Sequence, residues 1–209
     1  MSIVLFFFIS ATWVQAQPIP SYDEGFRWQE GFCQKEGKRG FNKDFLGECG
    51  QTARRLNNTK MPGSQFRGFS SFESNFSDSE FQQADFSYVE MKMCRIKTAH
   101  FEGSQFKSAN LVGCSLFRSS FVSANFQNAD LSGIKAVESD FRSANFRKTK
   151  LVGAQLMMAN LANADLRDTD LSLAHLELAN LRGAVFNIKT KLPIEVEAAK
   201  KRGMIWSND

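Results

Sequence analysis

The chain has 209 residues, and its 26 basic and 22 acidic side chains leave a net charge of +4, which excludes strongly acidic and strongly basic classes of protein. Hydrophobic residues make up 43% of the chain, too large a share for a disordered polypeptide. The 21 Phe stand beside 2 Tyr and 3 Trp, so some repeated structural demand selects phenylalanine.

Residues 1–16 are typical of a secretion signal. Residues 3–14 are apolar apart from Ser10 and Thr12, and Val14 and Ala16 are the small residues that a signal peptidase requires. The run is shorter than the roughly 20 residues of a membrane-spanning helix, so the sequence predicts cleavage after Ala16 and no transmembrane anchor. We therefore expect an exported protein, periplasmic or extracellular. A buried N-terminal strand is the alternative.

Residues 17–60 combine several aromatic residues with many glycines and charges and show no period. We expect a small N-terminal module that covers the element that follows it, and a separate ligand-binding head is the alternative. Cys33 and Cys49 both lie in this segment, and paired cysteines are common in exported proteins. The sequence predicts a Cys33–Cys49 disulfide.

A five-residue period runs from Phe66 to Phe186. Every fifth residue, here called an anchor, is large and apolar in 23 of 25 cases, the exceptions being Ser71 and Ala136. The residue two places before the anchor is Ala, Ser, Thr or Cys in 22 of the 25 cases. A period of five fits neither an α-helix nor a β-strand, so the chain must turn at every repeat.

Four such repeats would make a square coil of 20 residues, and residues 20 apart would then share an environment. Phenylalanine follows this rule, because it concentrates in two of the four resulting columns. One column contains Phe66, Phe86, Phe106, Phe126 and Phe146, and the other contains Phe81, Phe101, Phe121 and Phe141. The spacing thus supports a 20-residue coil independently of the five-residue count.

The repeats also match a known motif, A-(D/N)-L-x-x. Literal copies are Ala109-Asn110-Leu111, Ala129-Asp130-Leu131, Ala159-Asn160-Leu161, Ala164-Asp165-Leu166 and Ala179-Asn180-Leu181. Residues 61–186 therefore resemble the pentapeptide repeat family. The resemblance implies an all-β fold, a right-handed quadrilateral parallel β-helix (solenoid) of about six coils, in which the anchor and the small residue two before it point inward.

Two places depart from the motif. The large and small inward residues are exchanged at Ile134 and Ala136, which conserves interior volume and predicts no break in the solenoid. Phe69, Ser71 and Phe72 fit the register poorly, so we expect an irregular first coil.

Residues 187–209 are expected to form a C-terminal capping helix. A helix over residues 190–204 would have Pro193 in its first turn and Gly203 at its end, with Leu192, Val196 and Ala199 on one face. The segment resembles the tail that follows many pentapeptide repeat domains, and it would cover the last coil. Its basic triplet at residues 200–202 is interpreted as a solvated helix end, with phosphate contact as the alternative.

The sequence contains no catalytic motif and predicts no cofactor, no metal and no small-molecule substrate. His100 and His175 fall on different columns almost four coils apart, so they cannot share a metal ion. Asp and Asn residues before the anchors are interpreted as turn and surface groups. Cys94 and Cys114 are small inward residues 20 apart, and parallel side chains would hold their β-carbons too far apart for a good disulfide, so we expect free interior thiols.

A non-catalytic scaffold or protein-interaction module is the function that these features favour. The alternative follows from the resemblance, because quinolone-resistance members of the family mimic DNA and engage DNA gyrase. Residues 61–186 carry 13 acidic and 13 basic side chains, whereas a DNA mimic needs an acidic surface, and a signal peptide would remove the protein from gyrase. Direct binding to nucleic acid is a third, disfavoured possibility. It would use the cations Arg67, Lys107, Arg142, Arg147, Lys148, Lys150 and Arg167.

Apolar residues at outward positions indicate where a protein partner or a second copy would bind. Phe117, Val137 and Met157 each follow an anchor and stand 20 apart, so they stack on one side of the solenoid. Met158 and Leu178 occupy the next outward column. We call these five residues the apolar patch. The alternatives are that the N-terminal module or the C-terminal tail covers it, or that it is simply exposed.

Overall fold

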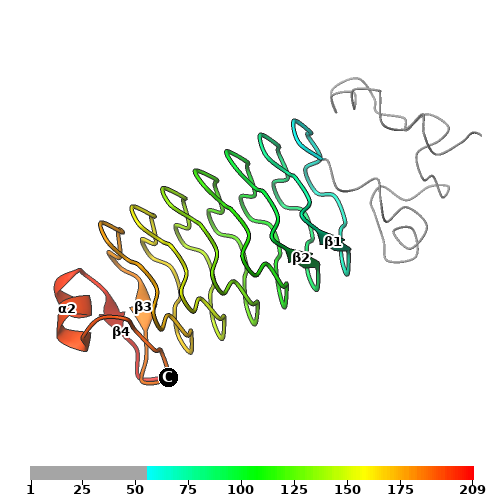
Figure 1. Ribbon diagram of the computed structural model, residues 1–209. Coiled ribbons are helices and arrows are strands. Elements are labelled where there is room, and N and C mark those ends of the chain that lie inside the picture. Colours follow the sequence, from blue (N-terminus) through cyan, green and yellow to red (C-terminus); the bar gives the residue numbers. More distant parts are fainter. Residues whose placement is uncertain (1–55) are drawn as a thin grey trace, which may run out of the picture.

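The computed structural model describes residues 56–209. Figure 1 shows a rod of stacked coils that runs from the cyan N-terminal coil to the orange C-terminal coil, where a short helix covers the end. The predicted signal peptide, most of the expected N-terminal module, and the predicted Cys33–Cys49 disulfide lie outside the described residues. The fold is the right-handed quadrilateral β-helix that the sequence predicts.

Each coil pairs with the next in parallel, 20 residues on. Bridges of this spacing begin at Lys60 with Glu80 and continue to Asp165 with Val185. At one side of the first coil they lengthen into strand β1 (Ser70–Phe72), which pairs with β2 (Glu90–Lys92). The 20-residue coil inferred from the phenylalanine columns is therefore confirmed.

Hydrogen bonds within and between coils use the backbone amides of each pentapeptide, as the repeat around Phe101 shows. The Phe101 amide donates to the Ser120 carbonyl at 2.8 Å and the Gly103 amide to the Val122 carbonyl at 2.9 Å, both in the next coil. The Ser104 amide closes the turn onto Phe101 at 3.1 Å, and the Gln105 amide donates to Ala84 in the preceding coil at 2.9 Å. These bonds meet the demand that buried backbone polar groups be paired.

Asp and Asn residues before the anchors accept a hydrogen bond from one more backbone amide in each repeat where they occur. Their Oδ1 atoms accept the N–H of the residue after the anchor, as Asn125 does from Gln127 at 3.1 Å and Asp130 from Ser132 at 3.0 Å. These are Asx turns, in which a side chain stabilises the bend in the chain. The interpretation of these residues as turn groups is confirmed at these positions.

The two residues after each anchor form the corner of the coil, and we call them the first and second turn positions. The second turn position adopts positive φ throughout the repeats, and 19 non-glycine residues do so. A left-handed backbone costs roughly 1–2 kcal/mol for a residue with a β-carbon. Non-glycine residues at the second turn position therefore adopt a backbone conformation that glycine would adopt at lower cost.

Phenylalanine fills two columns of the interior. Rings in one column are nearly parallel and stack with an offset, with centroids 5.1 Å apart for Phe86 and Phe106 and 5.0 Å for Phe106 and Phe126. The second column stacks at 5.3 Å, as in Phe101 and Phe121, and meets the first edge to face. Both arrangements are the favoured geometries of aromatic pairs, which explains the demand for phenylalanine.

Both departures from the motif are accommodated by exchanging large and small inward residues. Ile134 and Ala136 are fully buried, as predicted. In the first coil Phe69 is fully buried at the small position, while Phe72 in β1 is 55% exposed. The first coil thus keeps its hydrogen bonds to the next coil but not the usual order of residues.

The C-terminal segment is a cap, but its helix is shorter than predicted. Helix α2 (Val196–Lys201) ends before Gly203, whose φ is 82°. Residues 190–195 do not begin the helix, because Lys191 pairs with Asp170 as part of a further partial coil and Leu192 and Ile194 pack against the core. On the predicted helix face, Ala199 is buried whereas Val196 is 40% exposed.

A strand that the sequence did not predict completes the cap. Strand β4 (Ile205–Trp206) pairs in parallel with β3 (Val185–Phe186), so the chain returns to cover the edge of the last coil. Trp206 packs edge to face on Phe186, with ring centroids 5.3 Å apart. Arg202 donates to the carbonyls of Leu176 and Ala179 at 2.9 and 2.7 Å. The end of the solenoid is thus closed by backbone pairing and by a side chain.

Candidate interaction surface

The five residues of the apolar patch lie at one corner of the solenoid. Phe117, Val137 and Met157 occupy the first turn position in three successive coils, and Met158 and Leu178 occupy the second. Leu178 is 78% exposed, Met158 54% and Met157 36%, whereas Phe117 and Val137 are half-buried. The structure therefore brings all five together, and exposure increases toward the C-terminal end.

Phe117 is half-buried because a neighbouring cation covers it. The Arg118 guanidinium lies 4.8 Å from the centre of the Phe117 ring, and its Nε donates to Glu138 at 2.7 Å. A cation over an aromatic face is attracted to the ring. The patch therefore begins with a covered ring and continues into uncovered methionine and leucine.

Backbone geometry makes the exposed part of the patch costly to keep. Met158 and Leu178 have φ of 58° and 57°, in the left-handed region. Glycine or asparagine would be more stable there, and a large exposed apolar side chain gains nothing from burial. Folding alone therefore does not explain these two side chains.

Other exposed apolar residues were not singled out from the sequence. Leu173 and Ile188 are 77% and 79% exposed, and Tyr88 and Met93 are about half exposed, 47% and 52%. All four lie two residues after an anchor, and all except Ile188 have positive φ. A search for apolar residues two places after an anchor would have found them. They belong to other corners and do not extend the columns of the patch.

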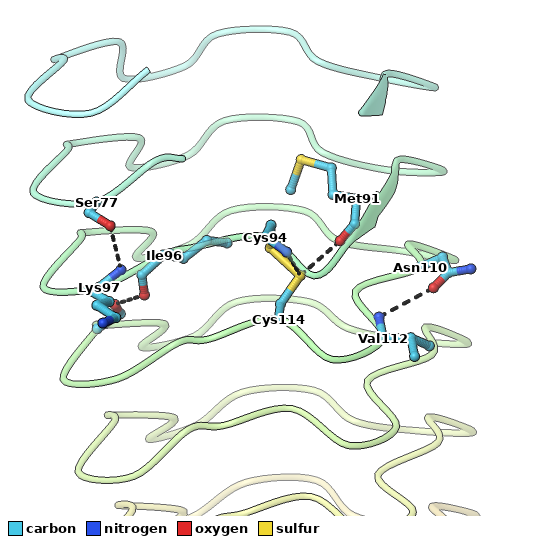
Figure 2. The surroundings of a disulfide bond; sticks show 9 residues. Ser77, Met91, Cys94, Ile96, Lys97, Asn110, Val112 and Cys114 are labelled. Atoms are coloured by element: carbon cyan, nitrogen blue, oxygen red, sulfur yellow. Dashed lines mark hydrogen bonds between the residues drawn. A yellow bond between two sulfur atoms is a disulfide. The ribbon is translucent and has the colours of Figure 1, made fainter. Parts of the chain in front are cut away.

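Cys94 and Cys114 form a disulfide, so the expectation of free interior thiols is wrong (Figure 2). Their Cα atoms lie 4.5 Å apart, within the range that a disulfide spans, and the side chains converge between the coils. Cys114 Sγ lies 2.8 Å from the Met91 carbonyl oxygen and accepts the Cys94 amide at 3.1 Å. Ser119 places its hydroxyl between Ala99 and Ile96 in the same way, so the disulfide occupies an ordinary small inward position.

The disulfide joins neighbouring coils and should stabilise the solenoid. We expect a Cys94→Ala, Cys114→Ser double variant to lose about 3 kcal/mol of unfolding free energy, the value typical of a loop of about 20 residues. A serine hydroxyl at position 114 can accept the amide of residue 94 and donate to the Met91 carbonyl, as Ser119 does with Ala99 and Ile96, so no buried polar group is left unpaired and the loss reports the covalent bond. Urea unfolding under oxidising conditions measures it, with the reduced wild-type protein as control. Equal stability of variant and oxidised wild type, or maleimide labelling of Cys94 or Cys114 in the native protein, would contradict the assignment.

Several cations of the predicted basic cluster are paired with acids. Arg142 binds Asp140 at 2.7 Å, and Lys150 lies 3.6 Å from Asp130. Arg67 lies 3.9 Å from Asp85 and packs over the ring of Tyr88. A nucleic acid would have to compete with these contacts.

Arg167 is the most strongly held of these cations, because it contacts both Asp165 and Asp209. Burial alone would raise the pKa of Asp165, but hydrogen bonds from Arg167, together with its charge, hold that pKa below its usual range. Arg167 thus ties the C-terminus to the solenoid.

The described residues offer no metal site and no membrane-spanning helix. Between residues 56 and 209 no group of three His, Cys, Asp or Glu residues is placed to hold a metal ion. His100 and His175 each contact a glutamate in their own coil, Glu102 and Glu177. Within the same residues, no helix has the length and apolar character needed to cross a membrane.

The stacked square coils place the protein in the class of β-solenoid repeat proteins. Comparison with known families shows which repeat it contains. The profile of the pentapeptide repeats family matches residues 99–135, 124–157 and 159–187, with eight copies in all. Residues 99–157 and 159–187 of this chain are therefore pentapeptide repeats. Proteins of this family are generally structural or interaction modules.

Solved structures of the same family resemble the chain at low sequence identity. Trypsin-treated QnrB1 R167E, a plasmid-mediated fluoroquinolone resistance protein, is 20% identical over 74% of this chain and 83% of its own, with a TM-score of 0.36. HetL, a pentapeptide repeat protein involved in heterocyst differentiation regulation from Nostoc sp. strain PCC 7120, is 16% identical over 72% of this chain and 83% of its own, with a TM-score of 0.24. A pentapeptide repeat protein from the Arabidopsis thaliana thylakoid lumen is 22% identical over 71% and 74%, with a TM-score of 0.20. No match was found among curated proteins.

Proposed function

We propose that the protein is an exported, non-catalytic module that binds another protein chain through the apolar patch. The observation that carries the proposal is the exposure of Met158 and Leu178 in left-handed backbone, next to Met157 in the same two columns. Methionine and aromatic residues are favoured at protein interfaces, and contact with a partner would bury side chains that folding leaves in water.

Export is part of the proposal and rests on two observations. Residues 1–16 have the pattern of a cleavable signal peptide. The Cys94–Cys114 disulfide supports an oxidising compartment, because such bonds are rare in reducing cytosol. Cleavage after Ala16 and the Cys33–Cys49 bond stay predictions, which intact mass and disulfide mapping of the protein from its native source would test.

DNA mimicry is the second candidate function and is disfavoured. The repeats carry equal numbers of acidic and basic side chains, so they lack the net negative charge of a duplex. Ion pairs such as Arg118 with Glu138 and Arg142 with Asp140 further neutralise the surface.

The proposal predicts that a Phe117→Glu, Met157→Glu double variant folds normally but loses its protein contacts. The two carboxylates would be placed in the middle of an apolar contact, where burying them is costly. Sedimentation velocity measures self-association, and affinity capture from the native source measures other partners. A Tyr88→Glu, Met93→Glu variant is the matched control, because it places two charges at other exposed corners. If the patch variant keeps the assembly state and the partners of the wild type, the apolar patch is not the functional surface.

A further inference from the structure

The column that forms the centre of the apolar patch ends in opposite charges. Its first turn positions, taken coil by coil, are Lys97, Phe117, Val137, Met157 and Glu177. Neighbouring coils are about 4.8 Å apart, so the column extends about 19 Å from the cation to the anion. The column is therefore arranged symmetrically about Val137, with one charge at each end, opposite in sign, and three apolar residues between them.

Both charged ends are available for a contact with another chain. Lys97 is exposed and forms no ion pair with any residue of the described range. The Glu177 side chain is 64% exposed, and its one ion-pair neighbour there is His175 Nδ1 at 3.6 Å. Among the described residues, no Lys or Arg lies within ion-pair distance of the Glu177 carboxylate.

We propose that the apolar patch binds a second copy of this chain in antiparallel orientation, a proposal that rests on the protein-binding role proposed above. The two-fold axis passes beside Val137. Lys97 then faces the partner's Glu177, Phe117 faces the partner's Met157, and Val137 faces the partner's Val137. A two-fold contact of this kind uses the same surface on both chains and closes on itself.

The second turn column is compatible with the same axis. It reads Thr98, Arg118, Glu138, Met158 and Leu178, so the antiparallel contact places Leu178 on the partner's Thr98. Met158 would lie against the partner's Arg118. Glu138 faces its own copy at the axis, and each of these carboxylates is already paired with Arg118 of its own chain at 2.7 Å.

Charge fixes the direction of the pair. A parallel arrangement would place Lys97 against the partner's Lys97 and Glu177 against the partner's Glu177, and like charges across an interface disfavour a contact. Two columns of five residues make a small interface by the standards of stable complexes. The dimer should therefore be concentration-dependent, and salt should weaken it because its end contacts are exposed ion pairs.

The test uses two charge-reversal variants, Lys97→Glu and Glu177→Lys, in the oxidised, mature protein. Each variant alone should dissociate at least about tenfold more readily than the wild type, because both end contacts become like-charged. An equimolar mixture of the two should dimerise about as well as the wild type, because each end of the mixed dimer again pairs opposite charges. Sedimentation velocity over a concentration series measures all four samples. Recovery of the dimer in the mixture also shows that both variants are folded.

The outcomes separate this proposal from the broader one. If the wild type dimerises and the mixture fails to restore the dimer, the antiparallel pairing is wrong. If the wild type stays monomeric up to millimolar concentration, yet captures another protein in a way that Phe117→Glu, Met157→Glu abolishes, the second copy is wrong and the protein-binding role stands. If the patch variant changes neither assembly nor capture, both proposals fall.

Discussion

Deletion of residues 190–209 should make the protein aggregate and lower its melting temperature by many degrees. The truncation removes β4 from the edge of β3, and it also removes Ala199 and Met204 from the surface of the last coil. An uncovered strand edge above an apolar interior is a template for association with other chains. Light scattering during size-exclusion chromatography and a thermal melt measure the effect. A monodisperse truncated protein with an unchanged melting temperature would show that the segment is not a cap.

A single residue tests the same cap without removing the chain. Arg202→Met keeps the aliphatic stem but removes the guanidinium that donates to the Ala179 carbonyl and to the Leu176 carbonyl, and the latter then keeps only the Ala179 amide as a donor. Hydrogen bonds that involve a charged group contribute about 1.5–3 kcal/mol, so the unfolding free energy should fall by roughly that amount. Lys201→Met is the matched control, because Lys201 is an exposed residue of the same helix turn.

Substitution of Phe121 by alanine should cost about 3–5 kcal/mol of unfolding free energy, the range found for large cavities in packed cores. Phe121 is fully buried and stacks at 5.3 Å on both Phe101 and Phe141, with Phe106 edge-on at 5.8 Å. Its loss interrupts the phenylalanine column in the middle of the rod. Denaturant unfolding measures the change.

Phe72→Ala provides the control for that prediction, because Phe72 is 55% exposed in β1. Its effect should be within about 1 kcal/mol, since little apolar area leaves contact with the protein. If the two variants lose similar amounts of stability, the stacked columns do not hold the interior together.

The regular part of the fold could be predicted because the same packing requirement, a large apolar side chain pointing inward, recurs every five residues. Each anchor must be large and apolar, and the spacing of the phenylalanines alone indicates that four anchors complete a coil. The exchange at Ile134 and Ala136 was predictable for the same reason, since the interior volume is shared between two inward positions.

The ends of the rod were harder to predict because the residues that close them follow no repeating pattern in the sequence. After Phe186 the register slips by one residue, and Asp170 pairs with Lys191 rather than with the residue 20 places on. Asn187 fills the gap, since its Oδ1 accepts the Asp168 amide at 3.1 Å in place of a backbone carbonyl. No sequence period indicates such a replacement, and the predicted helix consequently begins too early.

The columns of the apolar patch were predictable from the spacing of 20, but its exposure was not. The cover that Arg118 provides for Phe117 depends on one side-chain conformation, which the period does not determine. The error on Cys94 and Cys114 has a related origin. The repeat implies parallel side chains, whereas these two side chains converge between their coils.

Methionine oxidation mapped by peptide mass spectrometry tests most directly whether the apolar patch is covered when the protein is at work. Met158 and Met93 are almost equally exposed in the isolated chain, at 54% and 52%, but lie at different corners. In the dilute purified protein both should therefore react with peroxide at similar rates. In the fluid or compartment where the protein resides, the proposed contact predicts that Met158 becomes several-fold slower to oxidise while Met93 is unchanged. Equal rates for Met158 and Met93 in both settings would contradict the assignment of this corner as the interaction surface.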